Sequence, residues 1–216
     1  MAEKEKVSLT LLEAKKLERE IEQIEVETDS SRLELASKAQ EFEDDAARSD
    51  PNRVYHFFGS VDTKTVKHAI QTIEVWARRD PGEEITIIFN SPGGSVIDGL
   101  ALYDFLIKLR ETTRIVTVAR GMAASMGGVL LQAGTERIVG ANAHLLIHEV
   151  PKLASGNLSE LEDEVKFAKR LQDRLLDILA ERSTLSKGQI KRKWTRADWW
   201  IGAEETLEFG FADEVG

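Results

Sequence analysis

The chain has 216 residues, of which 42% are hydrophobic and 31% are charged, and its formal net charge is -9. This length and apolar content suit one sizeable domain with an extension. Cysteine is absent, which excludes disulfides, thiolate metal sites and a cysteine nucleophile, and the negative charge argues against a general nucleic-acid surface.

Membrane and cofactor signals are missing from the sequence. No apolar run reaches the roughly eighteen residues of a membrane span, and the start at Met1-Ala2-Glu3-Lys4 has no signal-peptide pattern. We therefore expect a cytoplasmic protein with no membrane partner. No group of histidines and carboxylates has the spacing of a metal site, so we expect neither a metal nor a cofactor.

Residues 1–50 form an acidic segment, with 8 Lys and Arg against 15 Asp and Glu. Apolar residues recur there at three- and four-residue steps, which places Ala14, Leu17, Ile21 and Ile24 on one helical stripe and Leu35, Ala39 and Phe42 on another. Asp29-Ser30-Ser31 between them are N-cap residues, so the sequence predicts a helical arm with a capped break. The arm is either solvated, or its stripe packs on a neighbouring subunit or binds a scaffold protein.

Beyond Pro51, strand and helix patterns alternate along the chain. They predict strands at Val54–Phe58, Ile85–Asn90, Ile115–Ala119, Arg137–Gly140 and His144–Val150, and helices at Thr63–Arg79, Val96–Leu109, Met122–Ala133 and Leu158–Arg182. This alternation predicts an α/β protein, with residues 51–216 as its domain.

Ser125 lies on a turn that follows a buried-strand pattern. Small residues around it, such as Gly121 and Gly127, let the backbone turn sharply and leave the hydroxyl accessible. A helix that begins there supplies unpaired N–H groups and the positive end of a dipole. The pattern favours a serine nucleophile.

A second glycine turn, Ser91-Pro92-Gly93-Gly94-Ser95, also stands between a strand and a helix pattern. Two such corners side by side can form an oxyanion hole, in which backbone N–H groups stabilise the negative oxygen of a tetrahedral intermediate. A simpler interpretation is that both are ordinary turns and that Ser125 merely caps a helix.

His148 closes an apolar strand pattern and is a candidate general base, because an ordinary histidine titrates near neutrality. His144 is a competing candidate, whereas surface or packing roles are expected for His56 and His68. Asp198 is the best choice for an acid that orients the base. It stands beside three tryptophans, and we expect a carboxylate there to be poorly solvated unless it is paired.

Four motifs resemble those of the Clp protease proteolytic subunit (ClpP) family: Ser-Pro-Gly-Gly at 91–94, Gly-Met-Ala-Ala-Ser-Met-Gly at 121–127, Leu-Ile-His at 146–148, and Asp198 with the closing segment 203–213. The resemblance covers about residues 53–216. It implies a ClpP/crotonase-like superhelix of repeated ββα units, a serine endopeptidase, and a homo-oligomer of one or two stacked rings. Residues 151–182 would then form a projecting handle that interlocks two rings.

The resemblance also assigns roles by position. Ser125 would be the nucleophile, His148 the general base and Asp198 the orienting carboxylate, while the backbone N–H groups of Gly94 and Met126 would bind the oxyanion. By this resemblance, the substrates would be proteins or peptides, and an AAA+ unfoldase would be the partner that delivers them.

Several positions depart from the family pattern. Arg120 stands where the family has an apolar residue, and His148-Glu149-Val150-Pro151 stands in place of His-Gln-Pro. Residues 1–50 replace a short segment that helps to dock the unfoldase. Alternatives are therefore a phage-type capsid or scaffold processing protease that needs no ATPase, a crotonase-type acyl-CoA enzyme, and an inactive ring scaffold.

Overall fold

The computed structural model describes residues 32, 34, 37, 38, 50, 52–150 and 157–216. The chain divides into two compact units, Met1–Ala46 and Ala47–Gly216. Within the first unit the four described residues are helical. The predicted apolar stripes and the capped break of the arm lie outside the described residues, so the arm stays a prediction.

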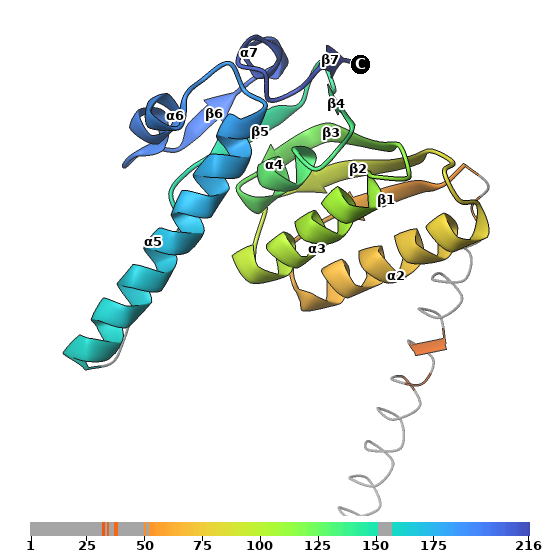
Figure 1. The fold of residues 1–216 in the computed structure, drawn as a ribbon, viewed down its shortest axis with the longest axis horizontal. Helices are drawn as coiled ribbons and strands as arrows, with labels where there is room; N and C mark the ends of the chain where they lie inside the picture. Colours follow the sequence, from red (N-terminus) through yellow and green to blue (C-terminus); the bar gives the residue numbers. More distant parts are fainter. Residues whose placement is uncertain (1–31, 33, 35–36, 39–49, 51, 151–156) are drawn as a thin grey trace, which may run out of the picture. The chain divides into compact units, whose positions relative to one another are not determined.

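A mainly parallel sheet forms the centre of the second unit (Figure 1). Its main path runs through β1 (Val54–Phe58), β2 (Ile85–Ser91), β3 (Ile115–Ala124), β4 (Glu136–Val139) and β7 (Glu214–Val215), all in parallel pairs. Off this path, β5 (His144–Ile147) pairs in parallel with β3, and β6 (Trp199–Ile201) pairs antiparallel with β5. The site residues lie where β3, β5 and β6 end or begin.

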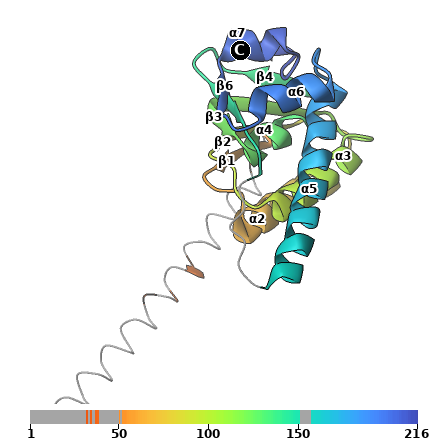
Figure 2. The ribbon, with the colours of Figure 1, turned by 90° about the vertical axis from the view of Figure 1, so that its left-hand side faces the viewer.

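Helices connect the strands in the order expected of an α/β protein. Helices α2 (Thr63–Arg79) and α3 (Val96–Leu109) lie side by side against the sheet, as Figures 1 and 2 both show. The short helix α4 (Met126–Leu131) packs on α3 and β3. Helices α5 (Leu158–Glu181), α6 (Lys187–Trp194) and α7 (Ala203–Glu208) complete the unit.

The hydrophobic core joins the sheet to these helices. Its largest fully buried side chains include Trp76, Phe57, Phe89, Leu102 and Met126. Met126 fills the space that Gly99 leaves open on α3, since a Cβ on Gly99 would collide with the Met126 side chain. Core packing therefore reaches the first residue of α4, next to Ser125.

Helix α5 is buried only near its C-terminal end. Leu175, Leu176, Ile178 and Leu179 are buried, whereas Leu158 and Val165 are 74% and 43% exposed. The first half of the helix extends away from the sheet (Figure 1), which is the arrangement expected of the projecting handle, whose role stays a prediction. Residues 151–156 of the predicted handle lie outside the described residues.

The sequence prediction was also wrong about the chain around Ser125. Met122, Ala123 and Ala124 were assigned to a helix, but they continue β3 and pair with residues 144–146 of β5. The helical propensity of these small residues is outweighed by their pairing with a strand that is distant in the sequence. β5 ends at Ile147 rather than Val150, and the prediction missed α6, β6, α7 and β7 altogether.

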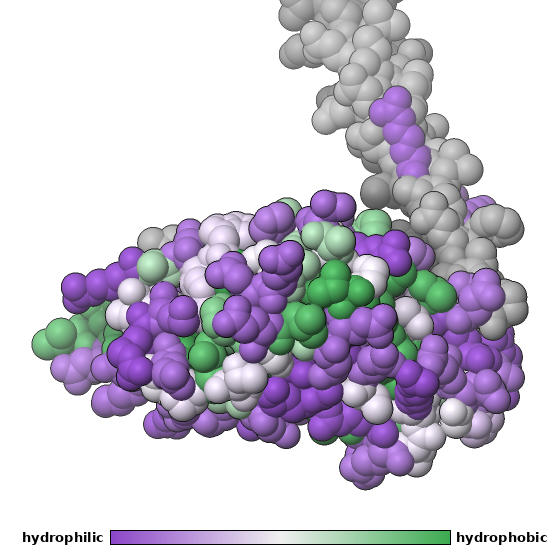
Figure 3. All heavy atoms as spheres, turned by 90° about the horizontal axis from the view of Figure 1, so that it is seen from above, coloured by the Kyte–Doolittle hydropathy of each residue, from purple (hydrophilic) through white to green (hydrophobic). Residues whose placement is uncertain are grey.

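The surface seen in Figure 3 is mostly hydrophilic, with smaller hydrophobic patches between the polar side chains. Within the described part of the chain, we find no helix that combines the length and apolarity needed to cross a membrane.

Candidate active site

Ser125 occupies the corner between β3 and α4 in a strained backbone conformation, with φ 54° and ψ -120°. A side chain disfavours positive φ, so the surrounding structure must hold the residue there. The Ser125 N–H donates to the carbonyl oxygen of Leu146 on β5 at 2.8 Å. The Ser125 hydroxyl makes no capping hydrogen bond to α4. Ser125 is therefore not a helix-capping serine, contrary to the simpler interpretation of this turn.

The Gly93-Gly94 turn packs directly against this corner. Gly93 has φ +89°, and a Cβ there would lie 2.7 Å from the Ala124 carbonyl oxygen and 2.9 Å from the Met126 nitrogen. Only glycine allows so close an approach at this backbone conformation. The two corners that the sequence predicted separately are thus in contact.

The backbone N–H groups of Gly94 and Met126 lie at these two corners. Val61 donates to the Gly93 carbonyl at 2.9 Å and accepts from the Ser95 N–H at 2.8 Å, so the Gly94 N–H between them points away from Val61. Met126 is the first residue of α4, where an N–H has no partner within the helix. These groups are the predicted oxyanion donors, and their roles stay a prediction.

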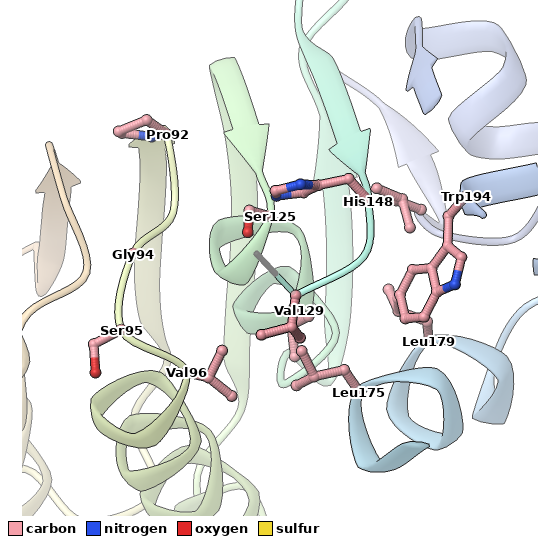
Figure 4. A pocket seen from close by; sticks show the side chains of 12 residues that line it. Pro92, Gly94, Ser95, Val96, Ser125, Val129, His148, Leu175, Leu179 and Trp194 are labelled. Carbon is pink, nitrogen blue, oxygen red and sulfur yellow. The ribbon is translucent and has the colours of Figure 1, made fainter. Parts of the chain in front are cut away.

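His148 follows the end of β5 and shares a cavity of about 380 Å³ with Ser125. In Figure 4 the imidazole extends over Ser125, and the side chains of Val129 and Leu175 lie below them. Other apolar side chains that line the cavity are Val96, Ile147, Val150, Leu179 and Trp194. Among the described residues, no hydrogen bond joins the Ser125 hydroxyl to His148. Catalytic hydrogen bonds are often long without substrate, so this does not remove His148 as a candidate base.

Asp198 immediately precedes β6 and comes close to His148. Ile147 pairs with Trp199, so continuing the antiparallel register by one step places His148 opposite Asp198. Their Nδ1 and Oδ1 atoms are 4.0 Å apart, which is about 1 Å too long for a hydrogen bond. The Asp198 side chain is 69% exposed, so the expectation that it is poorly solvated was wrong.

The other histidines have different settings. His144 is exposed at the start of β5, where it pairs with Met122, and it does not line the Ser125 cavity. His68 lies 2.6 Å from the Tyr55 hydroxyl, and the exposed His56 packs edge-on against Phe58. Of the four histidines, His148 is the one brought to Ser125.

Sequence reasoning missed two contributors to the site. Trp194 is 1% exposed and borders both the Ser125 cavity and the space between His148 and Asp198. Glu149 accepts a hydrogen bond from the Arg196 N–H at 3.0 Å, on the turn that carries Asp198. No local pattern indicates either contact, because each depends on how α6 and β6 return to β5.

A serine at a strained strand–helix corner, with a histidine in the same cavity and backbone N–H groups beside it, is the arrangement expected of a serine hydrolase site. The sequence pattern of the Clp protease family matches residues 37–216. The chain therefore belongs to the Clp protease family and is a serine-type endopeptidase.

Similar curated proteins carry the same description. The chain is 37% identical over 158 residues to the ATP-dependent Clp protease proteolytic subunit 2 of Tropheryma whipplei, covering 72% of this chain and 86% of that protein. It is 38% identical over 138 residues to the ATP-dependent Clp protease proteolytic subunits of Bacteroides fragilis and Bacteroides thetaiotaomicron. That alignment covers 63% of this chain and 65% and 61% of those two proteins.

Proposed function

We propose that the chain hydrolyses peptide bonds by acyl transfer through Ser125, His148 and Asp198. His148 takes the proton of the Ser125 hydroxyl as its oxygen attacks the peptide carbonyl, and Asp198 orients the imidazole. The N–H groups of Gly94 and Met126 stabilise the oxyanion, the amine leaves with the proton from His148, and water then hydrolyses the acyl-enzyme.

The observation that carries this proposal is the position of Ser125. Its hydroxyl is not used to cap α4, and its strained backbone lies between His148 and the Gly93-Gly94 turn. Strain of this kind clusters at functional sites, because it places a side chain where relaxed backbone would not.

The apolar lining of the cavity beside Ser125 favours binding of an apolar side chain of the substrate. Val96, Val129 and Leu175 line its wall, and Trp194 closes it next to His148. A branched or aromatic side chain bound there would hold the scissile carbonyl near the serine, since apolar surface is removed from water on binding.

A serine-directed phosphonate tests the assignment. We expect the probe to label Ser125 and not Ser95, which lines the same cavity and caps α3. Ser125→Ala should abolish labelling and reduce turnover of a fluorogenic peptide on the order of a million-fold without unfolding the chain. Labelling at Ser95, or full turnover by Ser125→Ala, would refute the proposal. The same measurement tests the acyl-CoA enzyme and inactive scaffold alternatives, since neither predicts peptide turnover that depends on Ser125.

Ring assembly and an AAA+ unfoldase partner are also part of the proposal. The first half of α5 is exposed and carries Leu158, Val165 and Phe167, which suits a contact with a second copy. The names of the relatives state ATP dependence, whereas the long acidic segment 1–50 favours the processing protease for capsid or scaffold proteins. Degradation of a folded protein, measured with and without a purified AAA+ unfoldase, distinguishes an unfoldase-dependent protease from a processing protease. Particle images of the same sample show the number of rings.

A further inference from the structure

The turn that carries Asp198 is held to the His148 segment by a carboxylate. After α6 ends at Trp194, Arg196 adopts a positive φ of 56°, and the Ala197 N–H returns to the Trp194 carbonyl at 3.2 Å. The Arg196 N–H donates to Oε2 of Glu149 at 3.0 Å. Glu149 is the neighbour of His148 in the chain, so this bond joins the two segments directly.

The second oxygen of Glu149 reaches helix α5. Its Oε1 accepts from Nε2 of Gln172 at 3.4 Å, which is a long and weak contact. Glu149 is partly buried, so its carboxylate is not free to turn as an exposed side chain would. The bond to Arg196 is the stronger of the two, because its length of 3.0 Å lies within the usual range for N–H···O bonds, whereas 3.4 Å lies beyond it.

The chain on the N-terminal side of Asp198 is held by few other contacts among the described residues. Strand β6 begins only at Trp199, so the sheet holds the chain after Asp198 but not before it. The side chain of Asp198 is mostly exposed. Without the bond from Arg196 to Glu149, the unfavourable backbone conformation at Arg196 would lose one of the contacts that offset it.

We propose that Glu149 is a positioning residue of the protease, which sets the distance between Asp198 and His148 by holding the Arg196 N–H. The inference rests on the proposed function, because it assigns the role through Asp198. Glu149 does not line the Ser125 cavity, so it acts through Asp198 rather than on the reacting atoms.

Substitutions at Glu149 test this role. Glu149→Ala and Glu149→Leu both remove the acceptor, and Leu keeps most of the side-chain volume. Both should lower kcat on the order of 10- to 100-fold with KM changed by less than about twofold, because a misplaced acid weakens catalysis rather than substrate binding. Glu149→Gln retains an acceptor oxygen and should restore kcat to within about threefold of the wild type.

A double-mutant cycle with Asp198→Ala identifies the path of the effect. If Glu149 acts through Asp198, Glu149→Ala should cause no further loss in kcat in the Asp198→Ala background. Asp173→Ala is the matched control, since Asp173 is a neighbouring carboxylate that pairs with Lys187 instead, and its kcat should stay within about twofold. Urea unfolding of every variant separates misplacement from loss of fold.

The results of these measurements distinguish failure of the positioning role from failure of the proposed function. An unchanged kcat in Glu149→Ala and Glu149→Leu, a rise in KM alone, or an equal loss in both backgrounds would overturn the positioning role while Ser125→Ala remains inactive. If Ser125→Ala retains turnover in the same series, the proposed function fails and this inference fails with it.

Discussion

Gly93→Ala tests whether contact between the two glycine corners creates the active site. The new Cβ would lie 2.7 Å from both the Ala124 carbonyl oxygen and the Ser125 Cβ. Ordinary contact begins at 3.4 Å, so the two corners must separate by about 0.7 Å. Shifts of this size at reacting groups cost on the order of 100-fold in rate, so kcat for a peptide substrate should fall by about that factor.

Gly59→Ala is the matched control for backbone strain. Gly59 also has a positive φ of +105°, but a Cβ there meets nothing within 4 Å. Both variants should lose about 1 to 2 kcal/mol from an alanine in the left-handed region. Gly93→Ala should lose about 1 to 3 kcal/mol more from overpacking, whereas Gly59→Ala should keep kcat within about twofold. Equal kcat values for the two variants, with both folded in urea titrations, would refute the reasoning.

Gly99→Ala should displace the Met126 side chain from its place against α3, lowering kcat about tenfold and stability by about 1 to 3 kcal/mol in the same assays. Arg137→Ala should destabilise the fold by about 1 to 3 kcal/mol in urea, because Arg137 is 2% exposed and its loss leaves the Gln132 oxygen and the Gly210 carbonyl without their donor, while Asp213 keeps Arg182. Burial raises the pKa of Asp213, but hydrogen bonds and charge from Arg137 and the charge of Arg182 outweigh it and hold this pKa below its usual 3.8. The Asp213 contribution is therefore present above pH 3.8 and lost as the pH falls through the lowered pKa, so Asp213→Asn should flatten that part of an acid unfolding curve.

Periodic patterns predicted most of the fold up to α5. The bounds of β1, α2 and α3 match the predicted ranges, because amphipathic periods and caps such as Asp62 and Ser95 act locally. Local information failed at Met122, Ala123 and Ala124, where small residues are compatible with a helix. Their pairing with β5, together with that of Ala123 with Ser91 of β2, decides that they form a strand, and no short window of sequence contains these partners.

Asp198 shows the same limit at the candidate site. The three tryptophans beside it in the sequence favour Asp198 as the orienting acid, yet its side chain is exposed and Trp200 is 50% exposed. The feature that brings it to His148 is the antiparallel pairing of β6 with β5. β6 has three residues and follows a helix that was also missed, so it offers no periodicity to detect.

The proposed triad is carried by neighbouring strands rather than by independent loops. Ser125 is tied to β5 by its bond to Leu146, and His148 and Asp198 extend the β5–β6 pairing by one step. Backbone spacing in a sheet is nearly constant, so the main chain already holds the three residues within side-chain reach. The remaining excess in the 4.0 Å separation of His148 and Asp198 lies within what rotation of an exposed aspartate can close. Closing the triad therefore requires a movement of the Asp198 side chain, and the proposed role of the Glu149–Arg196 bond is to hold the backbone from which that side chain moves.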